Sequence, residues 1–206
     1  MMNTEIFNQN VEAYEQWYKD YPQVFESELL AIKEQLQKLP ENLKGIEVGL
    51  GTGRFSELLG IKEGVEPSKE MAALAIKRGV SVLNGYAEQL PFGDLKFDFV
   101  LFVTVCHLDN IKHAFAEAYR VLKPAGAIVI GFLDRERSVA QQYLERRHRS
   151  TFYTVSRIEV LLKEAGFKSL EFNQTLFGNL DDIKEVQMSK EGFGEGSFIV
   201  VKATKK

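Results

Sequence analysis

The sequence predicts an α/β fold in which helices cover both faces of an open, mostly parallel sheet. From Gly45 onwards, short apolar segments alternate with amphipathic helical segments, which is the pattern of βαβ units. The segment 97–108, FDFVLFVTVCHL, is almost continuously apolar, as expected for a strand that is covered on both faces. Together these two patterns predict a doubly wound sheet.

Two helices are expected ahead of the sheet, between residues 10 and 39. Apolar residues recur there at the spacing of one helix face. Pro22 suits the first turn of the second helix, where an N–H group would have no partner in the helix, and Pro40 closes the segment. The residues that set the spacing are Val11, Tyr14, Tyr18, Leu29, Ile32, Leu36 and Leu39.

The alternating part of the chain predicts five strands and three helices between them. The strand segments are rich in β-branched and aromatic residues, and the helical segments carry apolar residues three and four positions apart. Strands are expected at 44–49, 61–67, 80–85, 96–105 and 127–133, and helices at 54–59, 68–79 and 111–123.

The chain after Leu133 predicts two more helices and two more strands. The arginine-rich stretch 134–153 has apolar residues at helical spacing and is interpreted as an inserted helix. Ser156 followed by Glu159 forms a capping box for a helix that ends near Gly166. Strands are expected near 168–177 and 197–203. The glycine-rich segment 191–196 between them is interpreted as a turn, with a flexible rim over a binding site as the alternative.

Composition, charge and cysteine count limit the kinds of protein that this sequence can be. The 206 residues carry a formal net charge of −3 and one cysteine, Cys106. We therefore expect a single domain over 1–206, no internal disulfide, no metal site and a reducing, cytoplasmic setting. The sequence has no apolar run long enough for a membrane span and no signal-peptide pattern. Without a basic excess, nucleic acid is not expected as a partner. No oligomeric state is predicted.

The most informative motif is the loop Gly49-Leu50-Gly51-Thr52-Gly53, which follows the first strand and precedes a helix. Glycines at alternate positions allow a sharp turn and a close approach to a ligand. The dinucleotide motif G-x-G-x-x-G fails, because Arg54 or Ser56 stands at its third glycine. Glu66, at the end of the second strand, suits two ribose hydroxyls. A nucleoside ligand is thus expected, unless the glycines only turn the chain and Glu66 only caps the next helix.

With these motifs in place, residues 45–133 resemble the class I S-adenosylmethionine-dependent methyltransferases of the small-molecule type. The resemblance rests on IEVGLGTGRF, GVEPS, NGYAEQLPF, FDFVLFVTV and AYRVLKPAG in this order. It implies a Rossmann-like fold with a seven-stranded sheet whose last strand is antiparallel. It also implies that residues 1–43 form a helical lid and that the inserted helix at 134–153 lies near the acceptor site.

The resemblance implies a site for S-adenosyl-L-methionine and its product S-adenosyl-L-homocysteine. The three glycines would pack against the methionine moiety, Glu47 would orient the loop or the amino group, and Glu66 would hold the ribose. The adenine would lie against Met71. The positions assigned to the donor are Glu47, Gly49, Gly51, Gly53, Glu66, Pro67, Met71, Ala87 and Glu88. Tyr86 departs from the family pattern, because an acid usually precedes this Ala-Glu pair. Recognition of the adenine amine would then shift to Glu88, or Tyr86 would stack on the ring.

His107 and Tyr14 are the candidate catalytic residues. His107 follows the fourth strand, beside the expected donor methyl, and histidine suits proton removal at neutral pH. The alternative is that His107 packs on the cofactor or caps the next helix with Asp109. Tyr14 is assigned by its place in the implied lid. Cys106 is interpreted as a packed apolar residue.

Three further features carry weaker hypotheses. The lid aromatics Trp17, Tyr18 and Tyr21 would line the acceptor site or form core. The cationic side chains of 135–149 would bind an anionic acceptor or, as we favour, form a solvated face paired with Glu136 and Glu145. Around the expected acceptor entrance stand Phe132, Asp134, Tyr143 and Tyr153.

A small soluble metabolite is the expected acceptor. Thr104-Val105-Cys106-His107-Leu108 contains no Asn/Asp-Pro-Pro-Tyr turn of the kind that holds nucleobases or amides in related enzymes. The favoured function is methyl transfer to such a molecule. The alternatives are a non-catalytic scaffold or sensor that binds S-adenosylmethionine or S-adenosylhomocysteine, and a nucleotide-dependent oxidoreductase, which the motif argues against.

Overall fold

The computed structural model describes residues 11–104, 108, 110–146 and 152–206, with the backbone only for 143–146. One sheet organises these residues, in the order β3-β2-β1-β4-β5-β8-β6-β7. Neighbours from β3 to β5 pair in parallel, and β8 runs antiparallel between β5 and β6. The strands are β1 (Gly45–Val48), β2 (Glu63–Val65), β3 (Ser81–Leu83), β4 (Phe97–Val103), β5 (Leu122–Leu133), β6 (Phe167–Thr175), β7 (Lys190–Glu191) and β8 (Phe198–Lys205).

The predicted α/β fold, mostly parallel with an antiparallel last strand, is confirmed. The expected count of seven strands is exceeded by one, β7, which has two residues and pairs with β6 at the sheet edge. The glycine-rich segment 191–196, interpreted from the sequence as a turn, therefore begins with the last residue of this edge strand. A strand this short has almost no alternation of polar and apolar residues, which is why the sequence does not reveal it.

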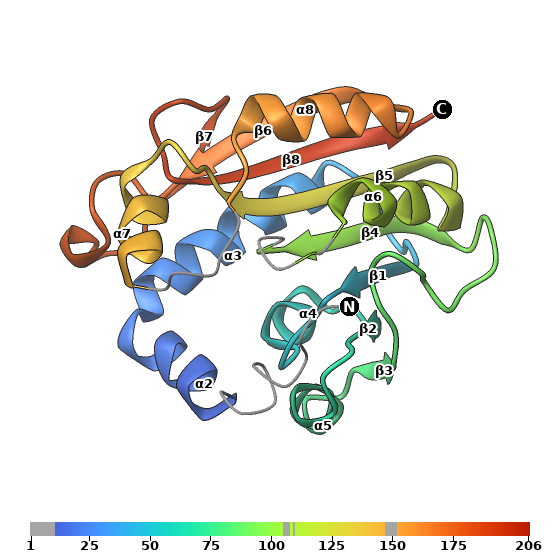
Figure 1. The fold of residues 1–206 in the computed structure, drawn as a ribbon, viewed down its shortest axis with the longest axis horizontal. Helices are drawn as coiled ribbons and strands as arrows, with labels where there is room; N and C mark the ends of the chain where they lie inside the picture. Colours follow the sequence, from blue (N-terminus) through green and yellow to red (C-terminus); the bar gives the residue numbers. More distant parts are fainter. Residues whose placement is uncertain (1–10, 105–107, 109, 147–151) are drawn as a thin grey trace.

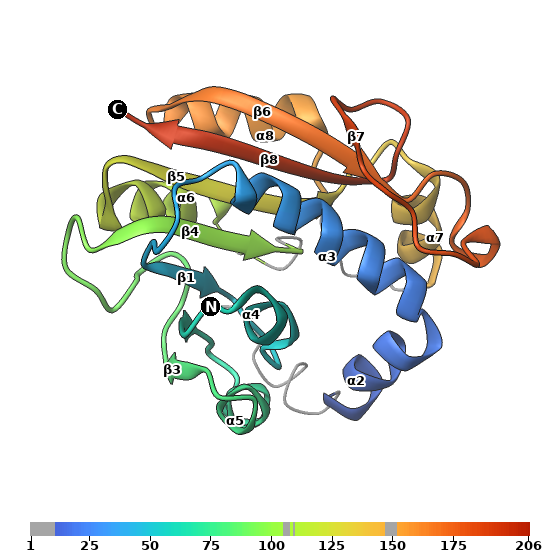
Figure 2. The same cartoon turned by 180° about the vertical axis from the view of Figure 1, so that it is seen from behind.

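Helices cover both faces of the sheet. In Figures 1 and 2, α6 and α8 lie on one face and α3 lies across the other, while α2 and α7 stand at the end towards which β4 and β5 point. The helices are α2 (Val11–Asp20), α3 (Pro22–Gln37), α4 (Arg54–Leu59), α5 (Lys69–Lys77), α6 (Ile111–Val121), α7 (Ser138–Arg146) and α8 (Val155–Glu164), with a 3-10 turn η2 (Leu180–Asp182). The two expected N-terminal helices and the inserted helix are thus present, and Pro22 opens α3.

The sheet separates two apolar cores. On the α6 and α8 side, Phe102 and Phe115 meet edge to face with ring centroids 6.0 Å apart. On the α3 and α4 side, Phe25 meets Phe55 in the same way at 5.0 Å. Since both faces of β4 and β5 are buried, their nearly unbroken apolar sequence is explained.

The expected capping box at Ser156 and Glu159 is wrong. Thr154 is the N-cap of α8, and its hydroxyl accepts a hydrogen bond from the backbone N–H of Arg157 at 3.2 Å. Ser156 lies inside the first turn. Ser, Thr, Asn and Asp cap helices almost equally well, so the Thr154-x-Ser156 pair left the boundary ambiguous by two residues. Gly166 follows the helix with φ +99°, as expected for a residue that ends a helix.

Helix α3 is held on the sheet by a buried polar contact. The Asn173 amide on β6 donates to the Ala31 carbonyl at 3.0 Å and to the Ser189 hydroxyl at 3.2 Å. Its oxygen accepts from the Gln35 amide at 3.2 Å. Asn173 and Gln35 are fully buried, so these bonds fix how far α3 and the preceding α2 lie along the sheet.

We expect Asn173→Ala to lower the free energy of unfolding by about 1–3 kcal/mol, because it leaves buried polar groups without partners. Urea denaturation measures this. Asn179→Ala is the matched control: Asn179 bonds Asp182 at an exposed site, and its loss should cost less than about 0.5 kcal/mol. Equal effects of the two substitutions would contradict the role given to Asn173.

Among the described residues, no helix has the length and apolar character required to cross a membrane.

Candidate functional site

The glycine loop turns at the carboxyl end of β1. Gly49, Gly51 and Gly53 have φ values of +70°, +56° and +79°, a region that other residues enter only with strain. A side chain on Gly49 would meet nothing within 4 Å, whereas one on Gly53 would come within 2.8 Å of Ala75 Cβ on α5. Gly49 thus keeps backbone open to a ligand, while Gly53 permits close packing of the loop on α5.

Glu66 joins this loop to the start of α5. One carboxylate oxygen accepts from the backbone N–H of Gly51 and the other from that of Ser68, both at 2.9 Å. Burial raises the pKa of Glu66, and these two hydrogen bonds oppose the rise. An ionised carboxylate offers about four acceptor sites, so both oxygens keep capacity for two ligand hydroxyls. Glu66 therefore both orders the helix start and fits a ribose. Ser68, rather than Glu66, is the N-cap of α5.

Glu47 is the most buried carboxyl group beside the loop, with 1% of its surface exposed. It accepts a short hydrogen bond from the Ser56 hydroxyl on α4. Burial raises the pKa of Glu47 to about 8, against the opposing effect of the Ser56 bonds, and the charge of Glu66 raises it further. This group is therefore poised to ionise when a positive charge arrives.

The raised pKa of Glu47 predicts a pH-dependent stability. The folded protein keeps a proton that the unfolded chain releases near pH 4.5, so this stabilisation is complete below pH 4.5 and lost as the pH rises through about 8. One pKa unit corresponds to about 1.4 kcal/mol. We expect Glu47→Gln to gain stability relative to the wild type between pH 5 and pH 8, by urea denaturation. The exposed control Glu41→Gln should track the wild type, and a constant Glu47→Gln difference would contradict this prediction.

The residues expected around the adenine converge from β2, α5 and the segment after β3. Met71 is 3% exposed, and its Sδ lies 3.6 Å from the position of a methyl group built on Gly51. Ala87 is buried, while Tyr86 is 39% exposed. Glu88 accepts a hydrogen bond from the backbone N–H of Asn110 at 3.1 Å, at the start of α6. The Pro67 carbonyl accepts from the Asn84 amide at 3.2 Å.

Helix α2 brings Tyr14 onto the glycine loop. The Tyr14 hydroxyl lies 3.2 Å from the position of a methyl group built on Gly51, so α2 and the loop are in close contact. It accepts a hydrogen bond from the Tyr18 hydroxyl at 2.7 Å. Burial raises the pKa of Tyr14 well above 10, and the charges of Glu47, Glu66 and Glu15 add to that effect. Tyr14 therefore keeps its proton at ordinary pH, and this proton is available for a hydrogen bond.

Glu15 connects the lid to three other segments. Its carboxylate accepts from the Thr52 hydroxyl in the loop, from Arg54 Nε at 3.1 Å on α4 and from Arg78 Nη2 at 2.8 Å after α5. Arg78 also donates to the Thr52 carbonyl at 2.6 Å. Burial acts to raise the pKa of Glu15, but the bonds from Arg54, Thr52 and Arg78 lower it to about 2. The Glu15 carboxylate thus stays ionised, and keeps these bonds, at all ordinary pH values.

We expect Glu15→Gln to loosen α2 and to lower the free energy of unfolding by about 1–3 kcal/mol, since two guanidinium groups lose their shared carboxylate. Because the pKa is about 2, the loss should be equal at pH 5 and pH 8. Chemical denaturation measures the loss, and hydrogen exchange locates it. Glu12→Gln, on an exposed position of the same helix, is the control. Unchanged exchange in α2 would contradict this role.

Several predicted residues lie outside the described part of the chain or away from the site. His107, Cys106, Asp109 and residues 147–151 are outside the described residues. Phe132, near the carboxyl end of β5, is 2% exposed and packs in the apolar core on the α6 side of the sheet. Arg137 pairs with the buried Asp134 at 3.8 Å, and Arg135 and Glu136 are exposed, while the side chain of Glu145 lies outside the described part of the chain. The lid aromatics pack on one another, with Trp17 and Tyr18 edge to face at 5.0 Å.

Sequence reasoning missed Glu15, Arg78 and Glu28. Glu15 and Arg78 carry no local signal, because their partners come from distant segments. Glu28 did carry one: it lies four residues after Val24 and four before Ile32, so helical spacing puts it on the apolar face of α3. A carboxyl group there is unusual and could have been noticed.

Comparison with known proteins now decides the family. A family model described as a methyltransferase domain matches residues 46–130. A crystal structure from Thermotoga maritima, described as a SAM-dependent methyltransferase and possible histamine N-methyltransferase, is 40% identical to this chain. The two structures share a TM-score of 0.92, over 98% of this chain and 99% of that one. The chain belongs to the class I S-adenosylmethionine-dependent methyltransferase family.

Curated relatives extend the same family across other organisms. An uncharacterised protein of Methanocaldococcus jannaschii is 39% identical to this methyltransferase, over 97% of this chain and 98% of its own length. An uncharacterised protein of Mycobacterium tuberculosis is 34% identical over 80% of this chain, which spans 60% of that longer protein. The matches to the Thermotoga maritima and Methanocaldococcus jannaschii proteins thus span nearly the whole chain.

Proposed function

We propose that this methyltransferase binds S-adenosyl-L-methionine at the glycine loop and transfers its methyl group to a small-molecule acceptor. The observation that carries the proposal is the pair formed by the left-handed loop and Glu66 at the carboxyl ends of the strands, where open α/β sheets bind ligands. The residues present fit the donor. Gly49 leaves its surroundings open, and Glu66 keeps acceptor capacity for ribose hydroxyls.

The two acidic side chains beside the glycine loop favour a methyl donor that carries a positive charge. Glu47 and Glu66 are both buried beside the loop, with pKa values raised by burial. A sulfonium cation near them favours their ionised forms and is attracted in return. The same reasoning predicts weaker attraction to the neutral product, S-adenosyl-L-homocysteine, which helps the product to leave.

The chain would act mainly by positioning and by excluding water. When bound, the sulfonium supplies an activated methyl group for an in-line displacement by the acceptor. The loop and Glu66 hold the donor side, and the lid residue Tyr14 covers Gly51 and offers a hydroxyl proton as a hydrogen-bond donor. Proton removal from the acceptor is assigned to His107 as a prediction from the sequence alone.

Titration calorimetry with S-adenosylhomocysteine tests the donor site, with NAD as the parallel control. We expect binding of the former and none of the latter. Gly51→Ala should weaken that binding at least tenfold, because its methyl group strains the loop and meets Tyr14. Gly60→Ala is the matched control: Gly60 has φ +74° and open space around it, so backbone strain is similar but the site is untouched. Equal binding by both variants would contradict the loop assignment.

Turnover tests the second half of the proposal. Purified protein is incubated with methyl-labelled S-adenosylmethionine and a panel of small acceptors. Histamine is the first choice, from the description of the Thermotoga maritima relative. Transfer to any member supports the enzyme. Donor binding without transfer to any acceptor would favour a non-catalytic scaffold or sensor.

A further inference from the structure

One buried carboxyl group is not used by the donor site described above. Glu28 on α3 is 7% exposed. Within the part of the chain that the structure describes, no hydrogen bond or ion pair reaches this carboxyl group, and burial alone raises its pKa to about 8. Buried carboxyl groups are almost always paired, because leaving water costs several kcal/mol when no partner replaces it. Among the described residues, therefore, none supplies the partner that a buried carboxyl group normally has.

The fold places Glu28 towards the carboxyl ends of β4 and β5. Ile32, one turn further along α3, lies opposite Gly131 on β5: a methyl group built on Gly131 would be 3.3 Å from Ile32 Cδ1. The backbone N–H of Thr104, just after β4, donates to the Gly131 carbonyl at 2.8 Å. Since α3 begins at the end of the sheet to which these strands point, Glu28 lies nearer to that end than Ile32 does (Figures 1 and 2).

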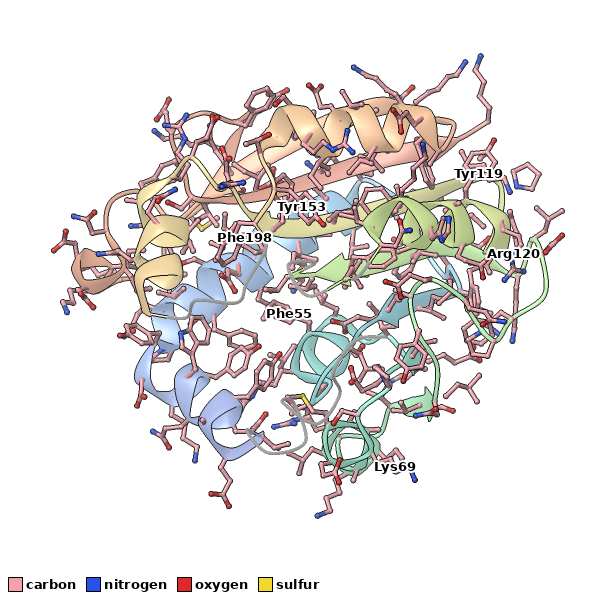
Figure 3. The ribbon with its side chains drawn as sticks, in the orientation of Figure 1. Phe55, Lys69, Tyr119, Arg120, Tyr153 and Phe198 are labelled. Carbon is pink, nitrogen blue, oxygen red and sulfur yellow. The ribbon has the colours of Figure 1, made fainter. Side chains whose placement is uncertain are left out.

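Glu28 is also coupled to the lid. Its charge raises the pKa of the buried Tyr18, after burial and the neighbouring Tyr14, so Glu28 and Tyr18 face the same region. Tyr18 bonds Tyr14, and Tyr14 touches the glycine loop. Tyr14 and Tyr18 thus form a polar connection from the donor loop towards Glu28, whose charge acts on Tyr18. Tyr18 belongs to the apolar core on the α3 side of the sheet, together with Phe55, which is labelled in Figure 3.

Two aromatic rings, those of Phe25 and Tyr18, meet near the same stretch of α3. Phe25, three residues before Glu28 on α3, meets Tyr18 edge to face at 5.0 Å. A carboxyl group beside aromatic rings is the chemistry that recognises ammonium groups, since the carboxylate pairs with the charge and the rings attract it through their faces. A neutral hydroxyl would gain less from either feature.

We propose that Glu28 is the acceptor-recognition residue and that the acceptor is a small amine, whose ammonium or N–H end binds the Glu28 carboxyl group. This inference rests on the proposed function and deepens it by naming the substrate class. Glu28 is a binding residue for the acceptor, separate from the donor residues Glu47 and Glu66. Its raised pKa fits this role, because the group gives up its proton most readily when a cation arrives.

The test uses matched amines and alcohols. The intact protein is saturated with S-adenosylhomocysteine, and its melting temperature is measured with histamine, 2-phenylethylamine and, as the neutral isostere, 2-phenylethanol. We expect at least one amine to raise the melting temperature and the alcohol to leave it unchanged. For an amine that is methylated, Glu28→Gln should raise KM at least tenfold with a smaller change in kcat. Glu26→Gln, on an exposed position of the same helix, is the control and should match the wild type.

The melting temperatures of Glu28 variants distinguish a ligand-binding role of Glu28 from a structural one. If Glu28 serves a ligand, Glu28→Gln and Glu28→Leu should fold and match or exceed the wild-type melting temperature without ligand, because an unpaired buried carboxyl group is removed. A large loss of stability in both variants would overturn the proposal, as would equal responses to amine and alcohol or an unchanged KM in Glu28→Gln. Failure of S-adenosylhomocysteine to bind the wild type would instead refute the proposed function. With donor binding intact, the failure of every amine refutes only the role of Glu28.

Discussion

The properties of the site depend on the burial of three carboxyl groups towards the carboxyl ends of the strands. Glu28, Glu47 and Glu66 come from a helix and two strands, and burial raises the pKa of each. Neighbouring structure compensates them unequally: Glu66 has two backbone N–H donors, Glu47 has Ser56, and Glu28 has no such bond from any described residue. The less a carboxyl group is satisfied by the protein, the more it gains from a cationic ligand.

Glu15 on α2 is a glutamate whose pKa is lowered rather than raised. Glu15 is only partly exposed, yet two guanidinium groups and a hydroxyl keep its pKa at about 2. Its role is mechanical, since it fixes α2 on the loop at every ordinary pH. The protein thus uses the ionised Glu15 to hold α2 in place. Buried glutamates with few hydrogen-bond donors, such as Glu28, are the ones proposed to bind a cationic ligand. The number of donors within reach decides which role a carboxyl group takes.

Sequence reasoning succeeded where the signal was local. The order of strands and helices follows from periodicity, and the glycine loop with Glu47 and Glu66 could be assigned because motif and flanking strands are contiguous. It failed where contacts are long-range. Glu15 meets partners 37, 39 and 63 residues away, and no pattern in α2 announces them. The cap of α8 and the two-residue β7 were missed because near-equivalent residues compete for a boundary, and a two-residue strand has no period.

The arrangement implies a compromise between stability and ligand binding. Burial of the polar side chains of Tyr18, Glu47 and Glu28 costs free energy in the protein without a ligand. The Glu15 connections and the Asn173 contacts supply opposing stabilisation from residues that need not touch a ligand. Fold stabilisation and ligand binding are thus assigned in part to different groups, while Glu66 serves both. A binding site needs polar groups that the protein itself leaves without full hydrogen bonding, because such groups gain free energy when a ligand supplies the missing partner.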